Sequence, residues 1–113
     1  MQPSESQKEK DPIRQARGRR SKQKGARQEL RTRKFLENLG YSCARSSASL
    51  GLFDIIAVNK NEVKLVQVKS NRWPGTEETE QLKEFARDGC PKSCSVEIWV
   101  WADGKRLPRV KVL

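Results

Sequence analysis

The sequence has no histidine and only three cysteines among its 113 residues. An odd number of cysteines in so short a chain does not make a disulfide framework, which fits a reducing, intracellular compartment. A structural zinc site needs four ligands, whereas Cys43, Cys90 and Cys94 offer three. There is no apolar run of the roughly 20 residues that a membrane span requires, and the N-terminus is polar where a signal peptide is apolar. Membrane proteins and disulfide-rich secreted domains are therefore disfavoured.

Acidic residues are also scarce relative to basic ones. The chain has 14 Asp and Glu residues against 24 Lys and Arg residues, which gives a formal net charge of +10. A positive surplus of this size favours a polyanionic partner, and nucleic acid is the first candidate. The length favours one domain with one modest core.

The basic surplus is concentrated at the N-terminus. Residues 1–28 contain nine basic and three acidic side chains and so hold +6 of the +10. Residues 1–24 have almost no apolar side chains, so this stretch cannot bury enough surface to order itself. We therefore predict a flexible basic arm at residues 1–24 and a folded domain at residues 25–113. A solubilising tail is the alternative to an arm that follows phosphates, and we favour the arm.

The rest of the chain alternates between helical and strand patterns. Helices are expected at residues 25–39 and 76–89, and strands at residues 41–45, 53–58, 63–69, 96–101 and 109–113. The apolar face of the first helix contains Ala26, Leu30, Arg33 and Leu36. This order predicts a single α/β domain in which two helices flank a mixed, mostly antiparallel sheet.

Polar residues in the second and third predicted strands suggest a site for metal and phosphate. Asp54 stands at the entrance of an apolar strand, where a carboxylate is costly unless a cation, a metal or solvent accompanies it. Gln67 and Lys69 are two residues apart in the next strand and so point to the same face. If the two strands form a hairpin, an aspartate, an amide oxygen and an ammonium converge at one end of the sheet.

This combination suits hydrolysis of a phosphodiester bond. The reaction needs a hard divalent cation with oxygen ligands, which lowers the pKa of a bound water and neutralises charge on the phosphate. We expect Asp54 as the central ligand, with the Gln67 side chain, the Val68 carbonyl and Glu29 completing the shell. Lys69 is expected to stabilise the attacking hydroxide or the transition state.

Two motifs carry a resemblance to a known family. Asp54 followed by Gln67-Val68-Lys69 resembles the PD-(D/E)XK nuclease signature. The ordered set Lys24-Gly25, Glu29, Gly40-Tyr41, Arg45 and Ala48-Ser49 is similar to the start of the archaeal-type Holliday junction resolvases.

The resemblance implies a restriction-endonuclease-like fold, Mg²⁺ as cofactor with Mn²⁺ as a substitute, four-way DNA junctions as substrate and a homodimer with two active sites. It implies that residues 25–113 form the nuclease domain. The catalytic residues it implies are Glu29, Asp54, Gln67, Lys69 and Ser49, and the metal ligands are Glu29, Asp54, Gln67 and Val68. We also expect DNA contacts from Arg31, Arg45, Ser47 and Arg72.

The sequence departs from the family at three places. Gln67 replaces the usual acidic residue and gives up one negative charge, which weakens Mg²⁺ binding. Leu30 stands where the resolvases usually carry arginine, and the loop at residues 49–54 is shorter than theirs. The shorter loop affects junction specificity more than nuclease chemistry.

Several alternatives remain open at this point. One alternative is another nuclease of the same fold that acts on nicked, flapped or duplex DNA. The other is a catalytically inactive DNA-binding module of that fold. Trp73 either anchors its loop or stacks on a base, and we favour the anchor. Trp99 and Trp101 share a strand face and are expected in the core or a subunit interface. The acidic run Glu77, Glu78, Glu80 and Glu84 is interpreted as a solvated helix face.

Overall fold

The computed structural model describes the backbone of residues 12–46 and 51–113, and within these ranges the side chains from residue 25 onward. The elements in chain order are α1 (Pro12–Asn38), β1 (Ser42–Arg45), β2 (Ile55–Val58), β3 (Val63–Ser70), α2 (Thr76–Asp88), β4 (Cys94–Trp101) and β5 (Arg109–Val112). The predicted order of helices and strands is confirmed, and the boundaries agree closely except at the start of α1. No helix in the described part of the chain is long and apolar enough to cross a membrane.

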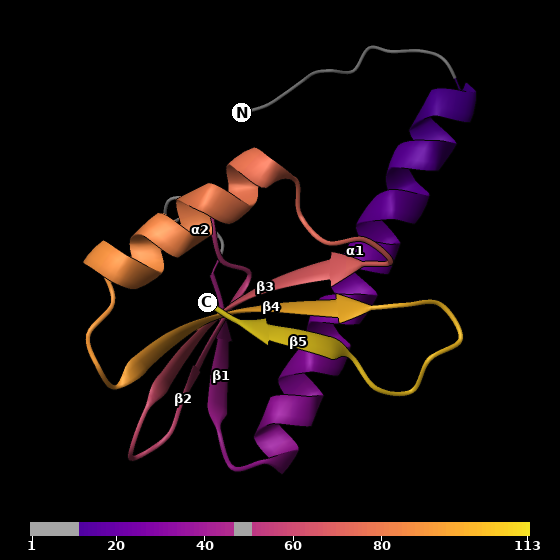
Figure 1. Ribbon diagram of the computed structural model, residues 1–113. Coiled ribbons are helices and arrows are strands. Elements are labelled where there is room, and N and C mark those ends of the chain that lie inside the picture. The colour runs from indigo at the N-terminus through magenta and orange to yellow at the C-terminus, as the bar shows by residue number, and fades with distance from the viewer. Residues whose placement is uncertain (1–11, 47–50) are drawn as a thin grey trace, which may run out of the picture.

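The five strands form one sheet in the order β1-β2-β3-β4-β5. The β3–β4 pair is parallel and the other three pairs are antiparallel, which confirms the mixed sheet predicted from the sequence. The parallel pair needs a crossover connection, and α2 provides it. The two helices lie on opposite faces of the sheet (Figure 1).

The core beneath α1 contains both tryptophans of β4. Its buried members are Leu36, Ile55, Ala57, Val66, Trp99 and Trp101. The Trp101 indole N–H donates to the Thr32 hydroxyl at 2.7 Å, and the Phe35 ring meets the Trp99 ring edge-on at a centroid distance of 5.4 Å. The two tryptophans are therefore core residues, one of the two positions predicted for them.

The core beneath α2 occupies the other face of the sheet. Its buried members are Phe53, Leu82, Val96, Ile98 and Val100. The Phe53 and Phe85 rings pack edge-on with centroids 5.2 Å apart, which fastens α2 over the segment that leads into β2. The sheet is thus covered on both faces, and we look for a functional site among the polar side chains at the ends of its strands.

The buried face of α1 differs from the predicted one. Gln28, Thr32 and Leu36 are buried, whereas Leu30 is 45% exposed. These three residues are spaced by four and so lie on one side of the helix. Thr32 tolerates burial because its hydroxyl donates to the Gln28 carbonyl at 2.8 Å. A search for apolar periodicity misses this face because two of its three members are polar.

The first helix also begins earlier than predicted. It starts at Pro12 rather than near residue 25, so the predicted start of this helix is wrong, whereas the basic arm at residues 1–24 stays a prediction. Proline is favoured at the first helical position, and the segment is rich in Gln, Ala, Lys and Arg, which are good helix formers. Intrinsic propensity extends the helix here without an apolar face.

Candidate active site

Asp54 lies directly before β2 and is bound to β3 by two hydrogen bonds. Its backbone N–H donates to the Val66 carbonyl at 2.8 Å. Its carboxylate oxygen Oδ2 accepts the backbone N–H of Val68 at 2.8 Å. Ile55 at the start of β2 pairs with Val66. The Asp54 carboxylate therefore binds the N–H of Val68, two residues beyond that pair on β3. The predicted approach of Asp54 to the Gln67-Val68-Lys69 segment is therefore present in the structure.

Gln67 and Lys69 meet a residue that the sequence did not single out. The Gln67 amide nitrogen Nε2 donates to Glu78 Oε2 at 2.6 Å and to the Leu52 carbonyl at 3.3 Å. The Lys69 ammonium lies 3.2 Å from Glu78 Oε1. Glu78 is in the first turn of α2, where the helix dipole favours a carboxylate. Its interpretation as part of a solvated helix face was wrong, because α2 turns this one side chain toward β3.

The side-chain oxygen of Gln67 has no partner within the protein. Gln67 is only 4% exposed, and its Oε1 is buried without a hydrogen bond. Both hydrogens of the amide nitrogen have acceptors in Glu78 and Leu52, which fixes the other atom as oxygen. Leaving such an acceptor unsatisfied costs about 1–3 kcal/mol. A buried oxygen in this condition is suited to a cation.

Glu29 on α1 approaches the same end of the sheet. Its carboxylate Oε1 lies 3.3 Å from Arg45 Nε in β1. Burial raises the pKa of Glu29, the negative charge of Asp54 raises it further, and Arg45 opposes both effects. Glu29 and Asp54 are therefore close enough to repel each other, and a divalent cation between them relieves that repulsion.

These donors fit a divalent cation with oxygen ligands. Two carboxylates, one unsatisfied amide oxygen and the backbone carbonyl of Val68 are the hard ligands that Mg²⁺ and Mn²⁺ accept. Among the described side chains, no group of three or more His, Cys, Asp or Glu residues is arranged to hold a metal. The candidate set does not contradict this, because half of it consists of amide and backbone oxygens. The assignment of these four residues as metal ligands stays a prediction.

The residues expected to contact DNA have different surroundings. Arg45 is exposed and pairs with Glu29 at the candidate site, whereas Arg72 is exposed in the loop after β3. The guanidinium of Arg31 lies 4.1 Å from the Trp101 ring centroid and donates to Gln28 Oε1 and the Lys105 carbonyl, each at 3.2 Å. These contacts give Arg31 a packing role within the domain, and its contact with DNA stays a prediction.

Ser47 and Ser49 lie outside the described residues. They follow Ser46 in the sequence, whose backbone N–H donates to the Asp54 carbonyl at 2.9 Å. Their expected positions near the scissile phosphate stay predictions. Trp73 is 40% exposed with the Arg109 guanidinium 5.5 Å from its ring centroid, which agrees with a loop anchor on β5.

The three thiols do not gather at one place. Cys43 packs in the core beneath α1, whereas Cys90 packs in the core beneath α2. Burial raises the pKa of the Cys94 thiol to about 12, and its hydrogen bond with Cys90 adds to the effect.

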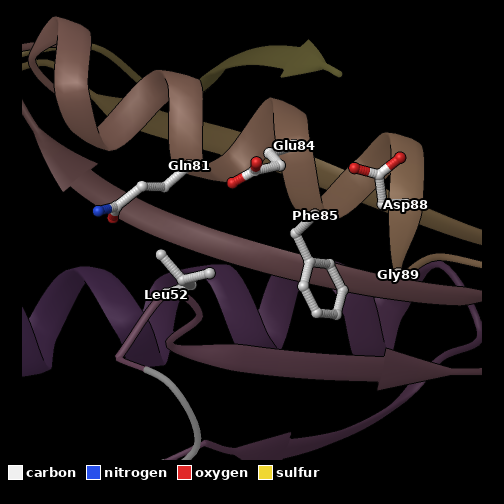
Figure 2. A pocket seen from close by; sticks show the side chains of 6 residues that line it. All are labelled: Leu52, Gln81, Glu84, Phe85, Asp88 and Gly89. Carbon is white, nitrogen blue, oxygen red and sulfur yellow. The ribbon is translucent and has the colours of Figure 1, made fainter.

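A shallow groove beside α2 is distinct from the candidate site. It encloses about 510 Å³ and is lined by Leu52, Gln81, Glu84, Phe85, Asp88 and Gly89 (Figure 2). Glu84 and Asp88 give it negative charge, which repels phosphate. The groove adjoins the candidate site only at Leu52, so we place the phosphate chemistry at Asp54 and Lys69.

Comparisons with known proteins show the family and the fold of the chain. The sequence matches the family of archaeal Holliday junction resolvases over residues 20–93, which include Glu29, Asp54, Gln67, Lys69 and Glu78. No curated protein matches the sequence. The structure is similar to that of Hjc, a Holliday junction resolvase from Archaeoglobus fulgidus, with a TM-score of 0.61 and 22% sequence identity.

The similarity to the Archaeoglobus fulgidus structure covers 76% of this chain and 73% of that one, and at this level of identity it shows a shared fold. The family match covers well over half of the 113 residues. The chain therefore belongs to the archaeal Holliday junction resolvase family of the PD-(D/E)XK nuclease superfamily.

Proposed function

We propose that the chain is a metal-dependent, structure-selective DNA endonuclease that resolves Holliday junctions at the Asp54 site, using Mg²⁺ as its ion. Membership of the family assigns Holliday junction resolvase activity, and this family is generally dependent on divalent metal. The observation that carries the assignment of the site is the buried Gln67 Oε1, which has no hydrogen-bond partner among the described residues. Gln67 lies on the β3 segment that binds the Asp54 carboxylate. Mn²⁺ is expected to replace Mg²⁺ because both ions take oxygen ligands.

The ion is held by residues from three elements in this proposal. Asp54 before β2 is the central ligand, and Glu29 of α1 supplies a second carboxylate. Gln67 Oε1 and the Val68 carbonyl of β3 complete the protein share. A divalent cation bound there supplies a water of lowered pKa and neutralises charge on the phosphate.

Lys69 is proposed to act on the phosphate itself. The Lys69 ammonium is partly exposed beside Glu78. From this place it donates to an oxygen of the scissile phosphate and offsets the negative charge that develops there. Ser49 is proposed to assist the same step, as the family resemblance implies.

DNA binding is proposed to extend from this site over the basic surface. Arg45 and Arg72 flank the site, and Arg31 and Ser47 are the further contacts expected. The net charge of +10 supplies the attraction for the phosphate backbone, which is independent of base sequence. Since the substrate is cellular DNA, we place the protein inside the cell.

A homodimer is the proposed active assembly. A four-way junction is symmetric and needs two cuts, so two copies related by a twofold axis match it. The edge strand β5 is exposed along its length, and Leu107, Val110 and Val112 present exposed apolar side chains on or beside it. Light scattering in solution tests this part of the proposal, and a monomer on and off the junction contradicts it.

The test of the function is cleavage of a synthetic four-way junction by wild type and by Asp54→Asn. We expect wild type to cut the junction in Mg²⁺ or Mn²⁺ and to be inactive in a chelator. Asp54→Asn keeps the shape of the side chain and is expected to bind the junction without cutting it. This variant separates binding from catalysis.

The choice of DNA substrate separates the remaining alternatives. Equal cutting of the junction and of matched linear, nicked or flapped DNA contradicts a resolvase and favours a nuclease of broader specificity. Binding without cutting in any divalent ion contradicts the enzyme and favours a DNA-binding module of the same fold. Cutting by Asp54→Asn at the wild-type rate contradicts the proposed site.

A further inference from the structure

We propose that Glu78 is a positioning residue of the metal site, which fixes the Gln67 amide so that Oε1 faces the divalent cation. The inference rests on the proposed function and adds a residue from α2 to the site. It also explains how a chain that has exchanged the usual acidic residue for Gln67 retains a metal ligand there.

The first step concerns what Glu78 binds. Its Oε2 accepts the Gln67 Nε2 hydrogen at 2.6 Å, and its Oε1 lies 3.2 Å from the Lys69 ammonium. Hydrogen bonds that involve a charged group are short and strong, and this one is short. Both carboxylate oxygens are engaged with donors on β3, so Glu78 orients side chains of the site and does not face the ion itself.

The second step concerns the orientation of the amide. An amide turned by 180° exchanges its oxygen and nitrogen, and the nitrogen would then direct its hydrogens at the cation. Glu78 and the Leu52 carbonyl are both acceptors, so they favour nitrogen on their side. The oxygen is thereby left on the opposite side, buried and without a hydrogen bond. Glu78 contributes most to this choice because its bond is shorter and charged.

The third step concerns charge. Replacing Gln67 by glutamate, the usual family residue, would place two carboxylates at the 2.6 Å separation now bridged by a hydrogen. Two like charges at this distance cannot both be ionised without a large cost. The amide at residue 67 and the carboxylate at residue 78 are therefore a matched pair. Exchanging them, as Gln67→Glu with Glu78→Gln, preserves both the hydrogen bond and the total charge.

The experiment is a double-mutant cycle on Mg²⁺ affinity, measured by isothermal titration calorimetry on the full chain without DNA. Glu78→Ala is expected to weaken Mg²⁺ binding by about 10-fold to 100-fold, the usual effect of losing a residue that orients a ligand. Gln67→Ala is expected to weaken it by a similar factor. In the Gln67→Ala background, Glu78→Ala is expected to have little further effect, because its target is gone.

Further variants guard against misfolding and against a simple charge effect. Glu78→Gln keeps the size of the side chain, and we expect an intermediate loss of Mg²⁺ affinity because its amide can bind Gln67 in either orientation. Glu77→Ala removes the same charge from an exposed neighbour and should leave the affinity nearly unchanged. The exchanged pair Gln67→Glu/Glu78→Gln should bind Mg²⁺ at least as tightly as wild type.

The outcomes separate this inference from the proposed function. If wild type binds Mg²⁺ and cuts junctions but Glu78→Ala binds the ion normally, the positioning role is wrong and the function stands. Equal losses from Glu78→Ala with and without Gln67 show that Glu78 acts as a ligand or through charge, which also overturns it. If wild type binds no divalent cation, the metal site and the role of Glu78 both fail.

Discussion

In the proposed mechanism, Lys69 is the residue that acts most directly on the phosphate after the metal ligands. It shares a strand face with Gln67 and is held 3.2 Å from Glu78 Oε1, yet about a third of its side chain is exposed. Lys69 is thus paired with Glu78 without being buried. In the proposed mechanism its ammonium turns from Glu78 to a phosphate oxygen when DNA binds.

We predict that Lys69→Ala lowers the rate of junction cutting by about 100-fold to 1000-fold, the usual effect of removing one group that stabilises the transition state. Mg²⁺ affinity should change little because Lys69 is not among the proposed ligands. Single-turnover cleavage and calorimetry measure the two effects separately. Lys83→Ala is the matched control, because Lys83 lies on the exposed side of α2 beside Glu80. A loss of Mg²⁺ binding in Lys69→Ala would contradict the assigned role.

At this scale the sequence predicts part of the site and misses part. The order of Asp54, Gln67 and Lys69 in the sequence and the two-residue period of a strand predict that they lie close together. Glu78 cannot be predicted in this way, because acidic residues in the first turn are favourable in any helix. The sequence does not distinguish Glu78, which faces β3, from its exposed acidic neighbours. The unsatisfied Gln67 oxygen is equally hidden, because burial and the direction of an amide depend on the packing of α2.

The strand β3 is joined to its neighbours by a buried charged network at the end opposite Lys69. Glu97 of β4 has only 3% of its side chain exposed and accepts three hydrogen bonds. The donors are Lys64 Nζ at 2.6 Å, the Trp99 indole at 2.9 Å and the Ser95 hydroxyl at 3.0 Å. The network ties the central parallel pair together and thereby keeps Gln67 and Lys69 in register with β4.

We predict that Lys64→Met lowers the free energy of unfolding by about 3 kcal/mol, because it leaves the buried Glu97 carboxylate without its cation. The partial exposure of Lys64 places the loss at the lower end of the usual range for a buried pair. Urea unfolding followed by circular dichroism measures it. Lys60→Met, in the exposed turn between β2 and β3, should change stability by less than about 0.5 kcal/mol. Equal effects of the two substitutions would show that the network is not stabilising.

The same network predicts a loss of stability at alkaline pH. The Tyr41 hydroxyl donates to Glu62, which raises the tyrosine pKa, and burial raises it further. Burial lowers the pKa of Lys64, but the hydrogen bond and charge of Glu97 outweigh that effect and raise it overall. Both groups hold their protons more tightly in the folded state. Their stabilisation is therefore complete below about pH 10 and is lost as the pH rises above it.

Comparison of wild type with Tyr41→Phe tests this dependence. We expect wild type to be more stable by about 1 kcal/mol near neutral pH, since the lost hydrogen bond involves a charged acceptor and is partly exposed. The difference should shrink as the pH rises above 10. Tyr41 is the sole tyrosine of the chain, so its ultraviolet absorbance reports its ionisation directly. A difference that grows with pH would contradict the direction of the pKa shift.

Among the elements, the strands were easier to predict than the first helix. The β-strands carry period-two patterns and turn signals such as Asp103-Gly104, and their order is recovered with small shifts at the ends. The inner face of α1 contains Gln28 and Thr32, so a hydrophobic pattern points to Leu30, which is exposed. Burial of these polar residues depends on hydrogen bonds with each other and with Trp101, which no local pattern contains.

Across the whole molecule, positive charge is carried beyond the body of the domain by α1. The helix runs past the edge of the sheet, and its N-terminal part projects away from the strands (Figure 1). Residues 12–24 include six basic side chains and no acidic one. A helix of this composition has no apolar face to bury, and its basic residues suit an extension that lies along phosphates.

We predict that neutralising this extension weakens junction binding without affecting the chemical step. The triple substitution Arg17→Gln, Arg19→Gln and Arg20→Gln removes three potential phosphate contacts and keeps good helix formers in place. Each lost contact should lower the slope of log affinity against log salt by about 0.9, so the slope should fall by up to about 2.7. Binding titrations over a salt series measure the slope, and single-turnover cleavage at saturating protein should remain at the wild-type rate.

The matched control neutralises charge on the body of the domain. Lys60→Gln with Lys92→Gln removes two exposed charges that lie outside α1, one after the end of β2 and one before the start of β4. This pair should leave the salt slope close to that of wild type, because turns remote from the proposed site release few counterions on binding. If the triple variant and the control reduce the slope equally per charge, then net charge alone governs binding. In that case the helical form of the N-terminal part of α1 confers no advantage over an irregular tail of the same composition.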